Sequence, residues 1–348
     1  MHSLIRSPGG HVLLESSDRP GRLIDMVGAG LFAGYGTWIL VAWARSGGSA
    51  VPALGLLLAC GLALVAARSM GSFARLVVPS AALAAALLVA AGSRTGVFSA
   101  SPLSGPLEYA NADGAFYVQA VIAGLMLAFG AGPRLLRALG GTGALFFAVL
   151  PFVIHAMASA ALLVVLPAIA LGSAALGPRA ARLAPALLGV AFVGTVGVTI
   201  LAGATYPPPL GRSLFQRSAL RLVDGERLSF WHDAYELMRG HPSTGVGPGR
   251  YSAVSPNALR DPDDRWAHNE FLQQGAEGGV MGLIFLALVF VWGFTRLSAG
   301  LSPDAVMLLG AASLAALGIH ASVDYVMHFP AIPILSASLV GTGMTDRR

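Results

Sequence analysis

Ten long apolar runs, separated by short polar segments, constrain what this chain can fold into. A helix that crosses the roughly 30 Å hydrocarbon core of a membrane needs about 20 mainly apolar residues. Composition agrees, because 55% of the 348 residues are hydrophobic and 11% are charged, whereas soluble domains carry about a quarter charged residues. The sequence therefore predicts an all-α integral membrane protein with about ten transmembrane helices. We expect these helices at 26–44, 51–67, 76–92, 115–131, 141–156, 158–174, 185–203, 278–295, 303–319 and 326–343.

The polar segments divide the chain into five parts. Residues 1–25 lack the basic region and short apolar core of a signal peptide and are predicted to form a cytoplasmic tail. Helices one to seven occupy 26–203, a long external loop occupies 204–277, helices eight to ten occupy 278–343, and 344–348 form a cytoplasmic C-terminus. The fifth and sixth runs form one apolar stretch broken only at His155 to Ser159, so nine spans remain the alternative.

Arginine placement predicts the orientation of the chain. With the N-terminus inside, the two termini and the short loops on their side hold twelve arginines, whereas the opposite short loops hold only Arg45 and Arg94. Short cytoplasmic loops retain positive charge, while long loops are translocated largely regardless of it. Both termini are therefore predicted to be cytoplasmic and 204–277 external.

The basic residues exclude several classes of enzyme. All 22 are arginine, and without a lysine the chain can form neither the phosphate-binding loop of an NTPase nor a Schiff base. The single cysteine, Cys60, excludes a disulfide framework and a cysteine zinc cluster. The sequence predicts no cofactor and no metal site, since a solvated acidic turn explains Asp261, Asp263 and Asp264.

Polar chemistry concentrates in the predicted external loop, which holds nine of the seventeen acidic residues. A helix is expected at about 227–239, because Leu228, Trp231, Tyr235 and Met238 recur at helical spacing. The segment 244–250 is too rich in glycine and proline for a strand.

An ordered series of motifs follows through this loop and the last helices. The series comprises Arg227 and Trp231, His241-Pro242 with Gly245-Val246-Gly247-Pro248-Gly249, His268-Asn269 with Leu272, Glu277-Gly278-Gly279 with Gly282, and finally His320, Asp324 and Pro330. Upstream, Ser104-Gly105-Pro106 and Asn111-Ala112-Asp113 precede the fourth span. Together these motifs resemble the O-antigen ligase and O-antigen polymerase-like family of bacterial membrane glycosyltransferases, over residues 76 to 343.

The resemblance implies a GT-C-like membrane glycosyltransferase of cell-envelope polysaccharide biosynthesis in the cytoplasmic membrane. It would move a glycan from an undecaprenyl-diphosphate donor to a sugar hydroxyl on lipid A-core or another glycan, without a metal. In this family, arginines hold the diphosphate and a histidine assists the acceptor hydroxyl. Ligation and polymerisation both remain open.

Two residues are predicted to be catalytic. Arg227 offers a planar, permanently charged guanidinium, which suits a diphosphate that gains negative charge as it leaves. His268 carries an imidazole that can take a proton from a hydroxyl near neutral pH. Glu270 or Glu277 could orient that imidazole, because each lies within one or two helical turns of it.

Six further residues are candidates for substrate binding. Arg250 could contact phosphate or glycan, with a surface salt bridge as the alternative. His320 and Asp324 could either lock helices together or place Asp324 beneath the loop to hold Arg227 or His268. The other candidates are Arg94, Asn269 and Glu277.

One departure from the family pattern concerns the sixth span. The family often carries Ser-Arg-Gly there, whose arginine is a second diphosphate ligand, but this chain reads Ala158-Ser159-Ala160-Ala161. Arg94 or His155 could replace the missing arginine at Ala160. Two rival functions stay open. Ten helices with intramembrane His and Asp would also suit a transporter or flippase-like carrier, and the missing arginine leaves open a non-catalytic scaffold for polysaccharide assembly.

Overall fold

The computed structural model describes residues 19–91, 107, 109–130, 132–206, 225–260, 265–300 and 303–345, and these parts contain helices but no strand. The first seven helices are α1 (Arg19–Ser46), α2 (Val51–Ser69), α3 (Ala74–Ala91), α4 (Ala110–Phe129), α5 (Arg134–Val153), α6 (Met157–Leu176) and α7 (Pro178–Ala204). The later helices are α9 (Gly225–Gly240), α10 (Tyr251–Val254), α11 (Pro256–Arg260), α12 (Glu270–Ser298), α13 (Ala305–Ala321) and α14 (Ala331–Gly343). The prediction of an all-α integral membrane protein is confirmed.

Every one of the ten apolar runs forms a helix. Eight helices, α1 to α7 and α12, are long and apolar enough to cross a membrane. The other two, α13 and α14, are apolar but have only 17 and 13 residues. The fifth and sixth runs form separate helices, because the chain turns at His155. The φ of this residue is 59°, which is incompatible with a right-handed helix.

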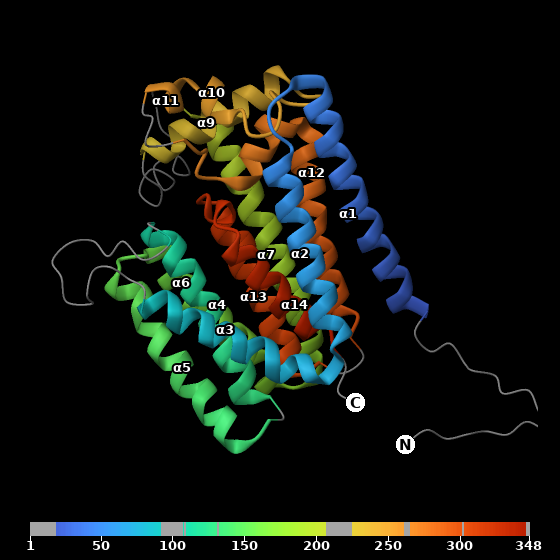
Figure 1. Ribbon diagram of the computed structural model, residues 1–348, viewed down its shortest axis with the longest axis vertical. Coiled ribbons are helices and arrows are strands. Elements are labelled where there is room, and N and C mark those ends of the chain that lie inside the picture. The colour runs from blue at the N-terminus through green and yellow to red at the C-terminus, as the bar shows by residue number, and fades with distance from the viewer. Residues whose placement is uncertain are drawn as a thin grey trace, which may run out of the picture.

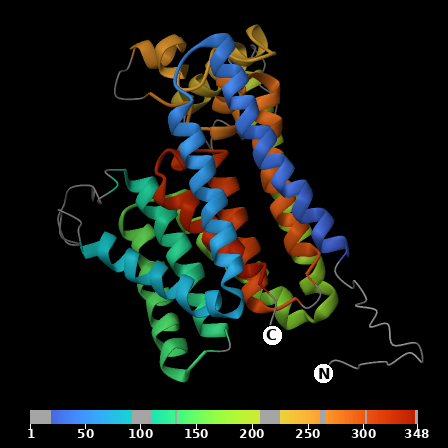
Figure 2. The same cartoon turned by 45° about the vertical axis from the view of Figure 1, so that its right-hand side comes forward.

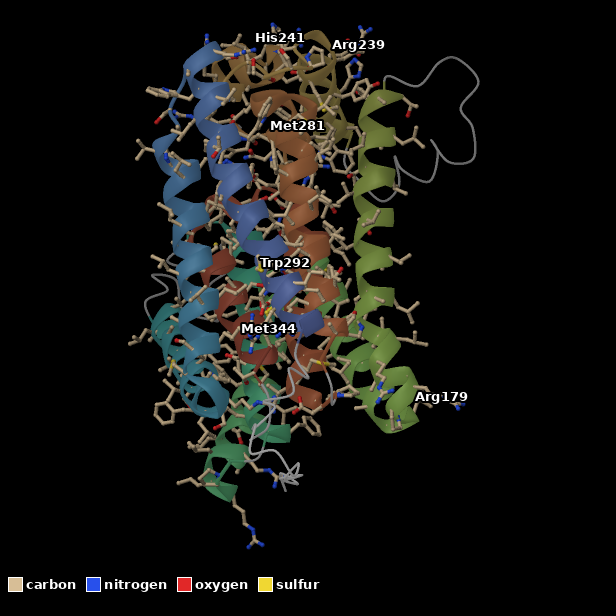
Figure 3. All side chains as sticks on the ribbon, turned by 90° about the vertical axis from the view of Figure 1, so that its right-hand side faces the viewer. Arg179, Arg239, His241, Met281, Trp292 and Met344 are labelled. Atoms are coloured by element: carbon tan, nitrogen blue, oxygen red, sulfur yellow. The ribbon has the colours of Figure 1, made fainter. Side chains whose placement is uncertain are left out.

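The helices leave two distinct ends on the molecule (Figure 1). Helices α9, α10 and α11 lie at one end, beside the start of α12 and the connection from α1 to α2. The start of α1 and the end of α14 lie at the other end. Figure 3 shows the same separation, with His241 at one end, Arg179 at the other and Trp292 between them.

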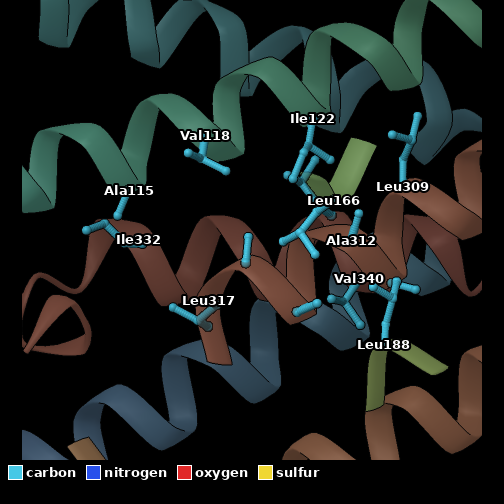
Figure 4. Packing of buried hydrophobic residues seen from close by; sticks show 14 of the residues in the cluster. Ala115, Val118, Ile122, Leu166, Leu188, Leu309, Ala312, Leu317, Ile332 and Val340 are labelled. Carbon is cyan, nitrogen blue, oxygen red and sulfur yellow. The ribbon is translucent and has the colours of Figure 1, made fainter. Parts of the chain in front are cut away.

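Helices α13 and α14 form the centre of the bundle. Helix α13 packs against α4, α6, α7, α12 and α14, whereas α2 and α3 pack along α14. Figure 4 shows the apolar side chains that meet there: Ala115, Val118, Ile122, Leu166, Leu188, Leu309, Ala312, Leu317, Ile332 and Val340. By contrast α1 and α2 remain largely exposed, as expected of helices that face lipid.

Helix α12 begins earlier than the predicted eighth span and contains a kink. Gly279 has φ 67° and ψ −171°, which interrupts the helical hydrogen bonding. Val280 N instead donates to Pro242 O at 3.0 Å. The part of α12 before the kink carries Glu270 and Glu277, which are both buried. This part of the helix lies at the same end of the molecule as α9 (Figure 1).

Candidate functional site

Arg227 lies in the first turn of α9, which is positioned by its apolar face. Leu228 and Trp231 of this helix are buried, and the helix packs on α7 and α12. This packing turns the Arg227 guanidinium toward the segment after α13. Its Nη1 donates to Val323 O at 2.9 Å, and its Nη2 lies 3.3 Å from Asp324 Oδ2.

His268 lies in the irregular segment just before α12, with its backbone held on both sides. Its carbonyl oxygen accepts a hydrogen bond from Trp231 Nε1 at 2.9 Å, and Asn269 caps α12 by accepting from Leu272 N at 3.0 Å. Its φ of 50° is rare for a residue other than glycine. Such strain is often held at functional positions. Its imidazole Nδ1 lies 3.4 Å from Asp324 Oδ1.

Asp324 joins these two residues. The turn after α13 buries its side chain to 1% exposure. Tyr109 donates its hydroxyl to both carboxylate oxygens at 2.8 and 2.9 Å, Asn111 Nδ2 donates at 2.8 Å, and Tyr325 N donates at 2.8 Å. Five groups from four parts of the chain therefore surround one carboxylate. Together, Arg227, His268, Asp324, Tyr109 and Asn111 are called the Asp324 cluster below.

The Asp324 carboxyl is ionised in this setting. Burial raises its pKa, but the hydrogen bond from His268 and the charge of Arg227 outweigh burial and lower the pKa to about 2. Burial and the charge of Asp324 raise the pKa of the Tyr109 hydroxyl, which therefore stays protonated and donates. The carboxylate beside Nδ1 favours the His268 tautomer that carries its proton on Nδ1, which leaves Nε2 as the nitrogen that can accept a proton.

His320 lies directly beneath Asp324. It occupies the last turn of α13 and is buried to 2% exposure. Its backbone oxygen accepts from Asp324 N at 2.9 Å. Among the described residues, its Nε2 has no hydrogen-bond partner, and its side chain packs with Ala115, Val118 and Leu317 around a small void. Its contacts place His320 below the cluster, whereas those of Arg227 and His268 place both within it.

A second polar cluster lies beside the first. Glu270 Oε2 is 3.2 Å from His328 Nδ1, and Trp266 packs on the His328 ring with centroids 3.8 Å apart. Gln273 Oε1 accepts from Ala267 N at 3.1 Å, so its Nε2 is the atom that donates toward His328 Nε2 at 3.2 Å. The carboxylate at His268 is thus that of Asp324, while Glu270 pairs with His328. The expectation that Glu270 or Glu277 orients His268 is wrong on this point.

Glu277 holds the glycine-rich turn. Its two carboxylate oxygens accept from Gly249 N at 2.7 Å and from Tyr251 N at 3.1 Å. The turn also pairs with α12 through Val246 N to Ala276 O at 2.8 Å and Gly247 N to Glu277 O at 3.0 Å. These contacts require glycine at 245, whose φ is 64° and where a Cβ would lie 2.4 Å from Ala276 O.

Arg250 falls outside the Asp324 cluster. Arg250 Nη1 donates to Ser46 O at 2.6 Å and ties the glycine turn to the end of α1. Arg94 lies outside the described residues. His155 is exposed at the end of α5, where its Nδ1 is 3.2 Å from Val153 O.

The start of α6 is closely packed at the position of the missing family arginine. Ala160 and Ser159 are buried. A Cβ on Gly114 of α4 would lie 2.5 Å from Ala156 Cβ and 2.7 Å from Ser159 Oγ. The space between α4 and α6 is thus filled by small side chains.

Sequence reasoning missed Tyr109, Tyr325 and His328. Tyr325 stacks on Tyr109 with ring centroids 4.7 Å apart and meets the His268 ring edge-on at the same distance. For the two tyrosines the available signal was position in the sequence, since Tyr109 stands two residues before Asn111 and Tyr325 directly follows Asp324. Among the described residues, no three His, Cys, Asp or Glu side chains could hold a metal ion together; Asp261, Asp263 and Asp264 lie outside them.

Residues 143–287 match the family model described as O-antigen ligase. This part of the chain is similar to the O-antigen ligase family. The match runs from α5 into α12 and includes Arg227, His268 and Glu277, which confirms the resemblance that the motifs predicted. It indicates a membrane enzyme of the glycosyltransferase type. Asp324 and Tyr109 lie outside the matched residues but complete the same cluster. No curated protein matches the chain.

Proposed function

We propose that this protein transfers a glycan from an undecaprenyl-diphosphate donor to a sugar hydroxyl on lipid A-core or on another glycan. One observation carries the proposal: a single buried carboxylate, that of Asp324, contacts both an arginine at 3.3 Å and a histidine at 3.4 Å. A leaving diphosphate needs a cation and an attacking hydroxyl needs a base. The Asp324 cluster supplies both within one site.

In the proposed step, the acceptor oxygen forms a bond to the anomeric carbon as the bond from that carbon to the phosphate oxygen breaks. The electron pair of the broken bond stays on undecaprenyl diphosphate. His268 Nε2 takes the hydroxyl proton, and the resulting imidazolium is stabilised by the Asp324 carboxylate at Nδ1. Arg227 stabilises the negative charge that grows on the diphosphate. No step calls for a metal.

The remaining candidates have supporting roles in this proposal. Asn269 and Glu277 shape the segments that present His268 and the glycine turn, through the cap of α12 and the backbone amides of Gly249 and Tyr251. Arg250 fixes that turn against α1. Arg227 is exposed over 27% of its side chain, whereas Asp324 is buried, so the arginine is the cation of the cluster that a substrate could reach.

Transfer by purified protein tests the proposal. Wild type should form glycosylated product from a lipid-linked donor and a glycan acceptor, and chelator should not reduce the rate. His268→Ala should lower the rate by about a hundred- to ten-thousandfold, the usual cost of losing a general base. His268→Gln should not restore it, because an amide cannot take the proton. Full transfer by well-folded His268→Ala would remove His268 from the mechanism, and no transfer by wild type would favour a carrier or scaffold.

The proposed site requires that α9 to α11 face outward in the cytoplasmic membrane, with both termini inside. A cysteine at exposed Leu259 of α11, introduced with Cys60→Ala, should react with an impermeant thiol reagent in intact spheroplasts. A cysteine at Arg179, at the opposite end of the molecule (Figure 3), should react only after the membrane is opened. The reverse pattern would show that the cluster faces the cytoplasm.

A further inference from the structure

Helices α1 and α2 diverge from their connection (Figure 2). Their side chains line an apolar crevice between the two helices. The crevice has a volume of about 890 Å³. Gly28, Gly36 and Leu40 of α1 line one wall, Leu57 and Gly61 of α2 line the other, and Trp292 of α12 lies at its floor. The outer edge of α2 is strongly exposed, with Leu58, Leu62 and Val65 at 62% to 70%.

One end of the crevice is closed by the loop that joins the two helices. Ser49 N donates to Pro248 O at 2.8 Å, and Arg250 Nη1 donates to Ser46 O at 2.6 Å. These contacts fasten the α1–α2 connection to the glycine turn, at the same end of the molecule as α9 (Figure 1). The packed backbone at this end leaves no room for a lipid headgroup.

The opposite end of the crevice is charged. Arg68 of α2 donates both Nη atoms to Asp25 of α1 at 2.5 and 2.6 Å, and Arg296 Nε donates to Asp25 at 2.8 Å. The Arg68 side chain is 30% exposed, and Arg68, Ser69 and Asp25 all line the crevice. Arg22 is exposed one turn before Asp25. These four ionic residues comprise three arginines and one aspartate.

We propose that the α1–α2 crevice binds an anionic phospholipid, with one acyl chain between the helices and the headgroup phosphate at Arg68. Basic pockets between membrane helices are suited to anionic headgroups. The α1 wall from Asp25 to Leu40 extends about 22 Å at 1.5 Å per residue, which covers one leaflet of a hydrocarbon core roughly 30 Å thick.

The charged end argues against the lipid-linked donor as the occupant. The donor's diphosphate would have to reach Arg227 in the Asp324 cluster, near α9. Arg68 lies at the other end of α2, so a lipid with its phosphate there has its headgroup in the opposite leaflet. The crevice is therefore a site separate from the reactive one, and only this exclusion of the donor rests on the proposed function.

The test compares lipid retention by variants that fill the crevice. Gly61→Leu and Gly36→Leu each place a side chain in it. A Cβ at 61 would lie 3.6 Å from Phe32, and one at 36 would lie 3.6 Å from Leu57 and 3.7 Å from Leu54, which are ordinary contacts. Gly30→Leu is the matched control, because it lies on α1 with nothing within 4 Å and does not line the crevice. Each protein is reconstituted with equal dioleoyl phosphatidylglycerol and dioleoyl phosphatidylcholine, re-extracted, and analysed by native mass spectrometry.

Wild type and Gly30→Leu should retain phosphatidylglycerol about tenfold over phosphatidylcholine, and both crevice variants should retain about tenfold less of it. Arg68→Gln should keep bound lipid but lose the preference between headgroups. Equal retention of the two lipids by wild type, or unchanged retention by both crevice variants, would overturn the proposal. A parallel reconstitution includes the lipid-linked donor. Loss of donor retention in the crevice variants, with phosphatidylglycerol unaffected, would overturn the proposal and assign the crevice to the donor's tail.

Discussion

Two aspartates at opposite ends of the molecule each gather two basic side chains, yet they do so in different ways. At Asp25, Arg68 and Arg296 donate directly at 2.5 to 2.8 Å. At Asp324 the short hydrogen bonds come from neutral Tyr109 and Asn111, while Arg227 and His268 lie at 3.3 and 3.4 Å. The first carboxylate is fully engaged by its cations and joins α1, α2 and α12. The second is held by neutral donors, and Arg227 and His268 lie beside it at longer distances.

Of three substitutions that test this difference between the two sites, Arg227→Lys should lower the rate of glycan transfer most. Lysine keeps the charge but loses the planar pair of donors that suits a diphosphate. Losing one charged hydrogen bond in such a site costs ~3 kcal/mol, or on the order of a hundredfold in rate. Single-turnover glycan transfer measures this effect, with membrane accumulation of the variant as the control for folding. A near-normal rate in both Arg227→Lys and Arg227→Ala would exclude the residue as the diphosphate ligand.

Asp324→Asn should lower transfer by about 10- to 100-fold, the usual effect of losing the group that orients a reactive side chain. Because the folded-state pKa of Asp324 is about 2, its ionised form stabilises the protein above its ordinary value near 3.8. That contribution is lost only as the pH falls toward 2. Asp324 itself therefore does not titrate between pH 5 and 7, but losing its charge makes the His268 imidazolium less stable, so the loss of activity on the acid side should move to lower pH in Asp324→Asn. An acid-side loss at the same pH in both proteins would show that Asp324 does not act on His268.

Asp25→Asn should have the smallest effect on transfer and should act on stability instead. Hydrogen bonds to charged groups contribute about 1.5 to 3 kcal/mol, and the Asp25 side chain, exposed over 29%, has two such partners. The variant should unfold a few degrees lower in a thermal scan in detergent, while transfer per folded molecule stays near the wild-type rate. Loss of transfer without loss of stability would mean that the two ends are coupled.

The sequence alone predicted the membrane helices but not where all of them begin. Apolar length predicted every membrane helix, because lipid imposes one rule on all of them. The starts of α4 and α12 were placed five and eight residues too late: Asn111 and Asp113, and likewise Glu270 and Glu277, looked like loop residues. These polar side chains are buried among helices rather than in lipid, and hydropathy does not distinguish the two.

The site was predictable in part. Arg227 and His268 could be proposed from motifs, and Asp324 from its position after an apolar run. The partnership of Tyr109 with Asp324 joins residues 215 positions apart. Nothing local specifies it, because it depends on how α4 packs against α13. The expected pairing of His268 with a nearby glutamate failed for the same reason: sequence proximity favoured Glu270, while tertiary packing brought Asp324.

The bonds between the glycine turn and α12 have a consequence for how this protein can vary during evolution. They join main-chain atoms: Val246 N to Ala276 O, Gly247 N to Glu277 O and Val280 N to Pro242 O. Main-chain atoms are common to nearly all amino acids, so mutation cannot delete these links by changing a functional group. Selection there acts on backbone dihedral angles, through Gly245, Gly247 and Gly279. Neighbouring side chains take no part in these links, so they are free to diversify on an unchanged backbone frame.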